Sequence, residues 1–395
     1  MLTDEQIEEI LFKYTSRQDE FNLSVIRVIA DRLSKLADFD DLNTLDRLIV
    51  MQKDIDTIKD LHRDYIKRQK KCLIDDFWWI ALIVYMEGLK FYEEQLELEM
   101  NKALMTALND ITLEAQKSLD NLLKNPVFVI RDLKNPAIYK AYNLEQTYRT
   151  VINEATSYKN VSDDLRDIAL KRVETQLFDS GVRYPISNSS DNAKDTTSAN
   201  QAVRFNVLDS AKRLINKMQD IMGKQFGADA VELSAHIYPA PDHAEAQGHQ
   251  YSLEDMEKIQ SGEDFEDLQG NKYIGFERNI GQWNCRHYFM KIKKGAEPTY
   301  TQKQLDKILA DNEKGYTDEK GRHRTLYECT QIQRRYEREI RKAKEKYIYA
   351  KTLGDKSMMT RARNSVGILT TRYKQFSRKC DIPAKLERIR VKDYK

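Results

Sequence analysis

The stretch AVELSAHIY, residues 230–238, decides the fold class of this 395-residue chain. Apolar residues at 231, 233, 235 and 237 alternate with more polar residues at 232, 234, 236 and 238. This period of two predicts a β-strand with one buried face. Tyr288, Met290 and Ile292 repeat the pattern more weakly. Most of the remaining chain places apolar residues three or four positions apart, so the sequence predicts an α+β fold that is predominantly helical.

The N-terminal part, residues 1–180, is predicted to be a long helical domain. Thr3, followed by Glu5 and Gln6, is typical of a capped helix start. The apolar spacing between Asp75 and Leu123 predicts a single long helix with one buried stripe. Asn-Pro pairs at 125–126 and 135–136 interrupt this pattern, because proline disfavours helix at its own position and at the one before. A further helix is expected from about 137 to 178.

The rest of the chain divides into three predicted segments. Residues 181–228 form a linker, SNSSDNAKDTTSANQ at 187–201, and a helix over 202–227. Residues 229–300 form a small α+β domain. Residues 301–395 form a basic helical hairpin, followed by a tail. The hairpin is predicted over 326–380 and turns at Gly354 and Asp355.

Composition excludes several classes of protein. The 14 glycines and 7 prolines are few for this length, which argues against an all-β protein with many tight turns. The longest apolar run, FWWIALIVYM at 77–86, is about half of what a membrane span requires, so it predicts a buried helical segment and no membrane. The acidic, amphipathic opening does not resemble a secretory signal. Four cysteines without a CxxC pair indicate free thiols in a reducing compartment.

Charge is divided unevenly along the chain. Residues 321–395 contain 22 Lys and Arg against 8 Asp and Glu, whereas the preceding residues contain 43 against 55. Such a division predicts a basic face that meets nucleic acid or an acidic protein surface; the alternative is a solvated helix face. The candidate contacts lie opposite the apolar stripe of the hairpin and are Arg334, Arg335, Arg338, Arg341 and Lys342.

A second unusual stretch is GQWNCRHYF, residues 281–289. Four of the six histidines, at positions 236, 243, 249 and 287, fall within 52 residues. If residues 285–292 form a strand, Cys285 and His287 point to the same face. Both could then bind one zinc ion, with His236 or His243 completing the site. The spacing matches no standard zinc module.

Two other interpretations of this stretch remain open. Cys285 could be a nucleophile activated by a histidine that Asp242 or Glu245 orients. In a purely structural arrangement, Trp283 fills a core, Asn284 caps a turn, and Arg286 and His287 tie loops together by hydrogen bonds. We expect Cys285, Arg286 and His287 to face His236 and His243 in a hydrogen-bonded arrangement without a cofactor, with zinc as the alternative.

Two segments together resemble a known family. AHIYPAPDHAEAQGHQYSL, 235–253, and IGQWNCRHYF, 280–289, are similar to paired motifs of the tailed-phage minor capsid proteins called phage minor capsid protein 2, relatives of the Mu F-like head morphogenesis proteins. TYTQKQLDKI at 299–308 and YECTQIQRRYEREIRKAKEKYIYAKTLGD at 327–355 extend the resemblance over roughly 180–395. The matching motif residues are His236, His243, Glu245, Gln247, Gly248, Trp283, Asn284, Cys285, Arg286 and His287.

The resemblance implies a structural virion protein rather than an enzyme. Family members lie at the portal vertex or the inner capsid surface and act in head assembly, DNA packaging or genome delivery. The implied partners are the portal protein, the major capsid protein or both, with several copies per virion, and packaged double-stranded DNA bound by the hairpin. The implied location is the phage head, with assembly in the host cytoplasm. The competing hypotheses are a metal-dependent nuclease or hydrolase centred on the Cys/His residues, and a DNA-binding scaffold protein.

Overall fold

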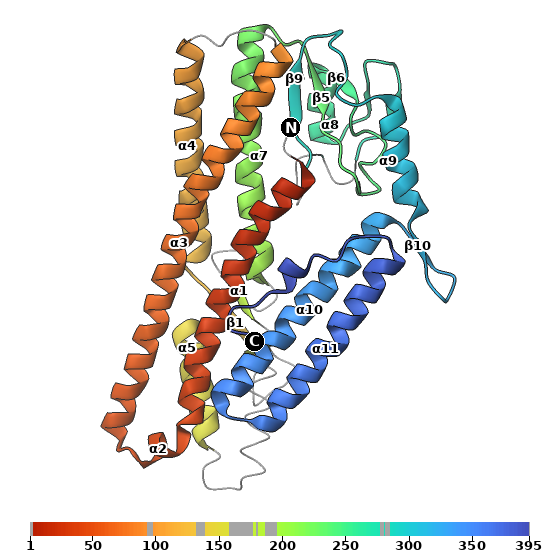
Figure 1. Cartoon of the computed structure of the whole chain (residues 1–395). Helices are drawn as coiled ribbons and strands as arrows, with labels where there is room; N and C mark the ends of the chain where they lie inside the picture. Colours follow the sequence, from red (N-terminus) through yellow and green to blue (C-terminus); the bar gives the residue numbers. More distant parts are fainter. Residues whose placement is uncertain are drawn as a thin grey trace.

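The computed structural model describes residues 3–92, 98–131, 139–157, 177–178, 181–185, 196–276, 280 and 285–394. Figure 1 shows the long helices α1, α3, α4 and α7 side by side in one half of an elongated molecule. A helical hairpin packs beside α1, and a small sheet domain lies at one end of α7. The predicted fold class, predominantly helical α+β, is confirmed.

The bundle and the hairpin are built from amphipathic helices. The bundle helices are α1 Asp4–Ser34, α2 Leu36–Asp41, α3 Thr44–Tyr92, α4 Leu98–Leu123, α5 Leu144–Ser157 and α7 Ala199–Phe226. The later helices are α8 Leu253–Ser261, α9 Gln302–Lys314, α10 Leu326–Leu353, α11 Lys356–Lys379 and the short 3-10 helix η2 Leu386–Ile389. None of the helices in the described part of the chain is long and apolar enough to cross a membrane.

The helix α1 begins as the sequence predicts. The Thr3 hydroxyl accepts a hydrogen bond from the Gln6 backbone N–H, and the Gln6 side chain accepts one from the Thr3 N–H. This reciprocal capping satisfies two backbone donors that a helix start leaves open. α9 and α10 begin with the same arrangement, at Thr301 and Thr325.

The prediction of one helix from Asp75 to Leu123 is wrong. α3 ends at Tyr92, and α4 begins at Leu98 and packs back against α3. Both helices bury one face in the same bundle core, around α7, so the three-to-four spacing continues on both sides of the break. The break itself falls on residues outside the described part.

The N-terminal half also contains a sheet that the sequence analysis missed. β1 Val127–Arg131 pairs with β2 Tyr139–Asn143 and with β3 Val182–Pro185, which pairs in turn with β4 Thr196–Ser198. All three pairings are antiparallel. Residues 139–143, predicted as helix, are therefore a strand, and 196–198, predicted as linker, are an edge strand. The remainder of the predicted helix after Ser157 lies almost wholly outside the described residues.

The apolar run 77–86 is only half buried. Phe77, Ile80 and Val84 enter the bundle core. Trp78 is 45% exposed and Leu82 is 54% exposed on the other face of α3. The prediction of a buried segment is therefore wrong for one helix face. A run that is apolar on all sides of the helix has no polar face, so its sequence does not indicate which side packs against another element.

The small domain is organised around a three-stranded antiparallel sheet in the order β6-β5-β9, formed by Gln250–Ser252, Ala230–Leu233 and Phe289–Ile292. The two predicted strands are thus direct neighbours, β5 in the centre of the sheet and β9 at its edge, with Leu233 opposite Phe289. Both faces of β5 are buried, contrary to the prediction of one buried face. The buried Glu232 carboxylate accepts hydrogen bonds from Gln250 and from the Thr299 backbone. Two small hairpins, β7 Phe265–Glu266 with β8 Lys272–Tyr273 and β10 Tyr316–Thr317 with β11 His323–Arg324, complete the strands.

The C-terminal hairpin confirms the predicted bounds closely. α10 ends at Gly354, whose φ of 76° suits a glycine in the left-handed region. Asp355 then caps α11 by accepting a hydrogen bond from the Met358 N–H. α10 contacts both α11 and α1, so the hairpin is attached to the bundle along α1.

Candidate metal centre and its link to the helical bundle

The two predicted motifs meet because β5 and β9 pair. The Ser234 backbone N–H donates to the Tyr288 carbonyl at 3.0 Å, immediately beyond the paired strands. This pairing brings the loop that follows β5 beside the segment that leads into β9. His243 in that loop, and Cys285 and His287 in that segment, are each at most 4% exposed.

The three side chains converge on one point. Cys285 Sγ lies 3.3 Å from His287 Nδ1 and 3.8 Å from His243 Nδ1. The ligand atoms of all three residues lie within 4.8 Å of one another. Residues 285–288 are not a regular strand, yet Cys285 and His287 still reach the same site.

Gln247 orients His287. Its side-chain oxygen accepts from the His236 backbone N–H at 2.8 Å, and its amide nitrogen donates to the His236 carbonyl at 3.1 Å. These two contacts fix which end of the amide is oxygen. That oxygen lies 3.3 Å from His287 Nε2. His287 Nε2 is therefore the protonated nitrogen, and the lone pair of Nδ1 faces Cys285.

His243 is oriented in a similar way. Its Nε2 lies 3.5 Å from a carboxylate oxygen of Asp242, which places the N–H on that side. Its Nδ1 is left to face Cys285. The Phe276 ring packs against the imidazole at 5.1 Å between centroids. Both imidazoles thus present Nδ1 to one sulfur.

The other motif residues have different positions. His236 is buried beside His287, with ring centroids 4.2 Å apart, whereas His249 faces Asp267 at 3.2 Å and takes no part in the cluster. Glu245 is exposed. Gly248 has a φ of 76° and approaches Leu305 of α9 closely. Trp283 and Asn284 lie outside the described residues.

Arg286 points away from the cluster, contrary to the prediction that it faces the histidines. Its guanidinium lies 3.7 Å from the buried Glu8 carboxylate of α1. Arg204 of α7 and Arg334 of α10 contact the same carboxylate at 2.6 and 2.9 Å, and Arg388 lies 4.0 Å away. Burial would raise the pKa of Glu8, but the surrounding arginines outweigh it and hold that pKa well below its usual range.

Glu8 was not singled out from the sequence, because no local pattern distinguishes it in an acidic helix start. Its partners come from residues 204, 286, 334 and 388. The carboxylate therefore joins α1 to the bundle centre, the second motif and the hairpin.

The predicted basic contacts of α10 fall into two groups. Arg334 pairs with Glu8, and the buried Arg341 pairs with Asp19 of α1 at 3.0 Å. These two side chains attach the hairpin to α1 and do not form part of a solvated face. Arg335 and Arg338 are exposed, and Lys342 is half-buried.

The chain matches the profile of one family, described as phage minor capsid protein 2, over residues 2–377. Searches of curated proteins and of solved structures found no match. The match covers the helical bundle, the paired motifs and nearly all of the hairpin, which extends the resemblance expected from residues 180–395. The chain therefore belongs to the phage minor capsid protein 2 family and is a structural component of a bacteriophage capsid.

Proposed function

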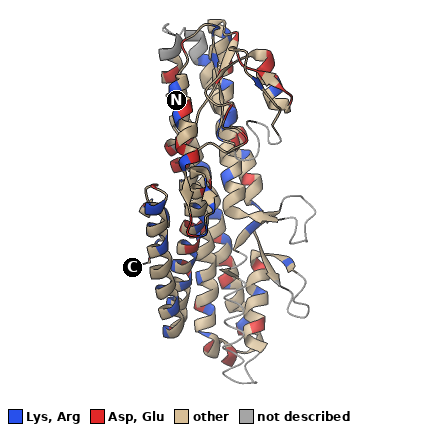
Figure 2. Ribbon diagram, turned by 90° about the vertical axis from the view of Figure 1, so that its right-hand side faces the viewer, with Lys and Arg blue, Asp and Glu red and all other residues tan. Residues whose placement is uncertain are grey.

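We propose that this capsid protein acts inside the phage head and contacts packaged double-stranded DNA through the exposed face of α11. The observation that carries the proposal is the charge of this helix. Lys356–Lys379 contains seven Lys and Arg and no Asp or Glu. All seven are exposed: Lys356, Arg361, Arg363, Arg372, Lys374, Arg378 and Lys379. Figure 2 shows Lys and Arg recurring in blue along the hairpin beside the C-terminus.

The arrangement of these charges fits a phosphate backbone better than a base sequence. They are spread over the length of a 24-residue helix, which spans roughly 36 Å. Binding of this kind neutralises phosphates and releases counterions, and it is independent of sequence. Arg335 and Arg338 of α10 extend the exposed basic face. Arg334 and Arg341 contribute indirectly, because they hold the hairpin against α1.

A salt titration of DNA binding tests this proposal. We expect the variant with Arg361, Arg372, Lys374 and Arg378 each changed to Gln to bind a DNA duplex more weakly. Each lost phosphate contact lowers the slope of log K against log salt by about 0.9, so the slope should fall by as much as ~3.6. The measurement is fluorescence anisotropy over a range of salt concentrations.

A matched control comes from α3. Lys53, Lys67, Arg68 and Lys71 are also exposed, so changing all four to Gln removes the same charge from a helix that bears acidic residues as well. This control should keep most of the salt slope. Equal slopes for the two variants would show a non-specific charge effect and contradict a contact by α11.

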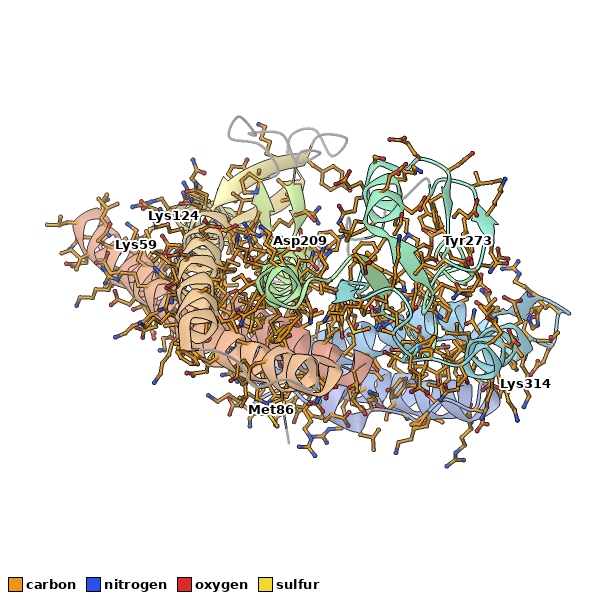
Figure 3. The ribbon with its side chains drawn as sticks, turned by 90° about the horizontal axis from the view of Figure 1, so that it is seen from above. Lys59, Met86, Lys124, Asp209, Tyr273 and Lys314 are labelled. Atoms are coloured by element: carbon orange, nitrogen blue, oxygen red, sulfur yellow. The ribbon has the colours of Figure 1, made fainter. Side chains whose placement is uncertain are left out.

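The protein partners follow as further proposals. We propose that the protein is held in the head by the portal protein, the major capsid protein or both, in several copies, after assembly in the host cytoplasm. The exposed apolar face of α3 supports a protein contact. Ile74, Trp78, Leu82 and Met86 recur every four residues and are each at least 39% exposed. Figure 3 shows Met86 at the rim of the molecule, away from Asp209 of α7.

A further inference from the structure

We propose that His243, Cys285 and His287 bind a structural zinc ion that fastens the two motifs of the small domain together. This inference concerns the fold of the motif domain and is independent of the proposed DNA contact. It rests on three observations: the distances between the ligand atoms, the orientation of the imidazoles and the burial of the site.

The distances fit a tetrahedral zinc ion. With Zn–S near 2.3 Å and Zn–N near 2.0–2.1 Å, tetrahedral coordination separates sulfur and nitrogen by about 3.5 Å. The observed separations from Cys285 Sγ are 3.3 Å to His287 and 3.8 Å to His243. Both separations lie within about 0.3 Å of that value, and all the ligand atoms lie within 4.8 Å of one another.

The imidazole orientations favour a cation over a hydrogen-bonded cluster. Both Nδ1 atoms direct a lone pair at the sulfur, because both Nε2 atoms face acceptors on Gln247 and Asp242. Nitrogen and sulfur atoms that converge on one point are the arrangement that zinc ligands adopt. A zinc ion satisfies both nitrogens and the sulfur at once, and the Cys285 proton is released to solvent when the thiolate binds.

The surroundings match those of structural zinc sites. Ligating histidines commonly direct their second ring N–H to a carboxylate or a carbonyl. Here His287 Nε2 lies 3.3 Å from the Gln247 amide oxygen, and His243 Nε2 faces the Asp242 carboxylate at 3.5 Å. A closed site with Cys and His ligands is typical of structural zinc. The ring of His236 lies beside that of His287, so His236 is the candidate for the fourth zinc ligand.

The ion would link segments that are far apart in sequence. Cys285 and His243 are separated by 42 positions, with α8 and the β7-β8 hairpin between them. The pairing of β5 with β9 holds together the two ends of the chain segment between these strands. The metal would add a second link, between His243 and the residues that lead into β9.

The first experiment uses the unmodified full chain. After incubation with zinc and gel filtration, elemental analysis should find about one zinc ion per chain. Zinc below roughly one ion per ten chains would overturn the proposal.

Variants identify the ligands. Cys285→Ser and His243→Asn should each weaken zinc binding by at least about 100-fold, and Gln247→Ala by about 10- to 100-fold, because it orients a ligand. Cys72→Ser and His323→Gln are the controls and should bind as the unmodified chain does. With Co²⁺ in place of zinc, the thiolate-to-metal absorption should disappear in Cys285→Ser. Retention of that absorption and of tight zinc binding in both ligand variants would contradict the assignment.

Discussion

Arg334 of the C-terminal hairpin places its guanidinium 2.9 Å from the carboxylate of Glu8, near the start of the first helix. The two residues are separated by 326 positions. Arg286 of the second motif and Arg204 of the central helix reach the same carboxylate. One buried anion therefore holds the basic hairpin, the motif domain and the bundle in a fixed arrangement.

Glu8→Gln should destabilise the protein by about 3–5 kcal/mol at pH 7, because it leaves several arginines around a group without charge. Urea unfolding measures the loss. Glu9→Gln is the control, since Glu9 is exposed on the same helix, and it should change the free energy of unfolding by less than about 0.5 kcal/mol. Hydrogen exchange should accelerate in α10 of the Glu8 variant. Equal stabilities of the two variants would refute the role of this junction.

The ion pairs of the Glu8 carboxylate predict that the stability of the protein falls in acid. The pKa of Glu8 is lowered in the folded state, so its contribution to stability is complete above its ordinary value near 4.5. The contribution is lost as pH falls from there towards the folded-state pKa. The stability difference between the unmodified chain and Glu8→Gln should therefore shrink below about pH 4.5. A difference that stays constant down to pH 3 would contradict the ion-pair origin.

Glu345 of α10 should make stability depend on pH in the opposite direction. Burial, and then the charge of Asp19, raise its pKa well above its usual range. The unmodified chain therefore loses stability as pH rises above about 4.5, because ionising the buried carboxyl is unfavourable. Glu345→Gln should therefore be more stable than the unmodified chain at pH 8 and equally stable at pH 4. Thermal unfolding at both pH values tests this, with the exposed Glu339→Gln as the control.

Gly248→Ala should test the packing of the first motif against α9. Gly248 has a φ of 76°, and a Cβ there would overlap with the buried Leu305 side chain. The backbone conformation costs about 1–2 kcal/mol and the overlap a further 1–3 kcal/mol. Gly321 has the same φ with open space around it, so Gly321→Ala should show only the first cost. Equal losses in urea unfolding would mean that Leu305 moves aside freely.

The exposed face of α3 predicts a defect in particle incorporation. Leu82→Gln together with Met86→Gln should leave folding intact, because both side chains are more than half exposed. The amount of protein recovered in purified heads should fall roughly tenfold or more if both side chains are buried at an interface. Leu45→Gln, at the other end of α3, is the control. Normal incorporation of the double variant would place the protein contact elsewhere.

Local patterns predicted the local structure well. The capping of α1 by Thr3, the hairpin turn at Gly354 and the strands β5 and β9 all follow from spacing and turn chemistry over a few residues. The meeting of Cys285 with the histidines followed from two short motifs. The cap, the turn and the strands depend on neighbours in sequence. Cys285 and His243 are 42 positions apart, so their meeting was expected only from the pairing of the two motifs.

The predictions that failed share a physical cause. Each depended on contacts between residues that are far apart in sequence. The helix break between Tyr92 and Leu98 keeps the apolar period, because both helices face one core. The arginines of α10 look alike in sequence, yet Arg334 and Arg341 meet carboxylates of α1 while Arg335 faces solvent. Arg286 stands between two cluster residues and still turns to Glu8. No spacing within a segment encodes these tertiary pairings.

DNA–protein crosslinking in intact heads tests the proposed position of the hairpin most directly. Heads are crosslinked with formaldehyde, the DNA is digested, and modified peptides of this protein are identified by mass spectrometry. If α11 lies against packaged DNA, adducts will concentrate on Lys374 and Lys379 and be rare on Lys53 and Lys67 of α3. Adducts on the α3 lysines with none on α11, or heads that lack the protein, would contradict a DNA contact by the hairpin.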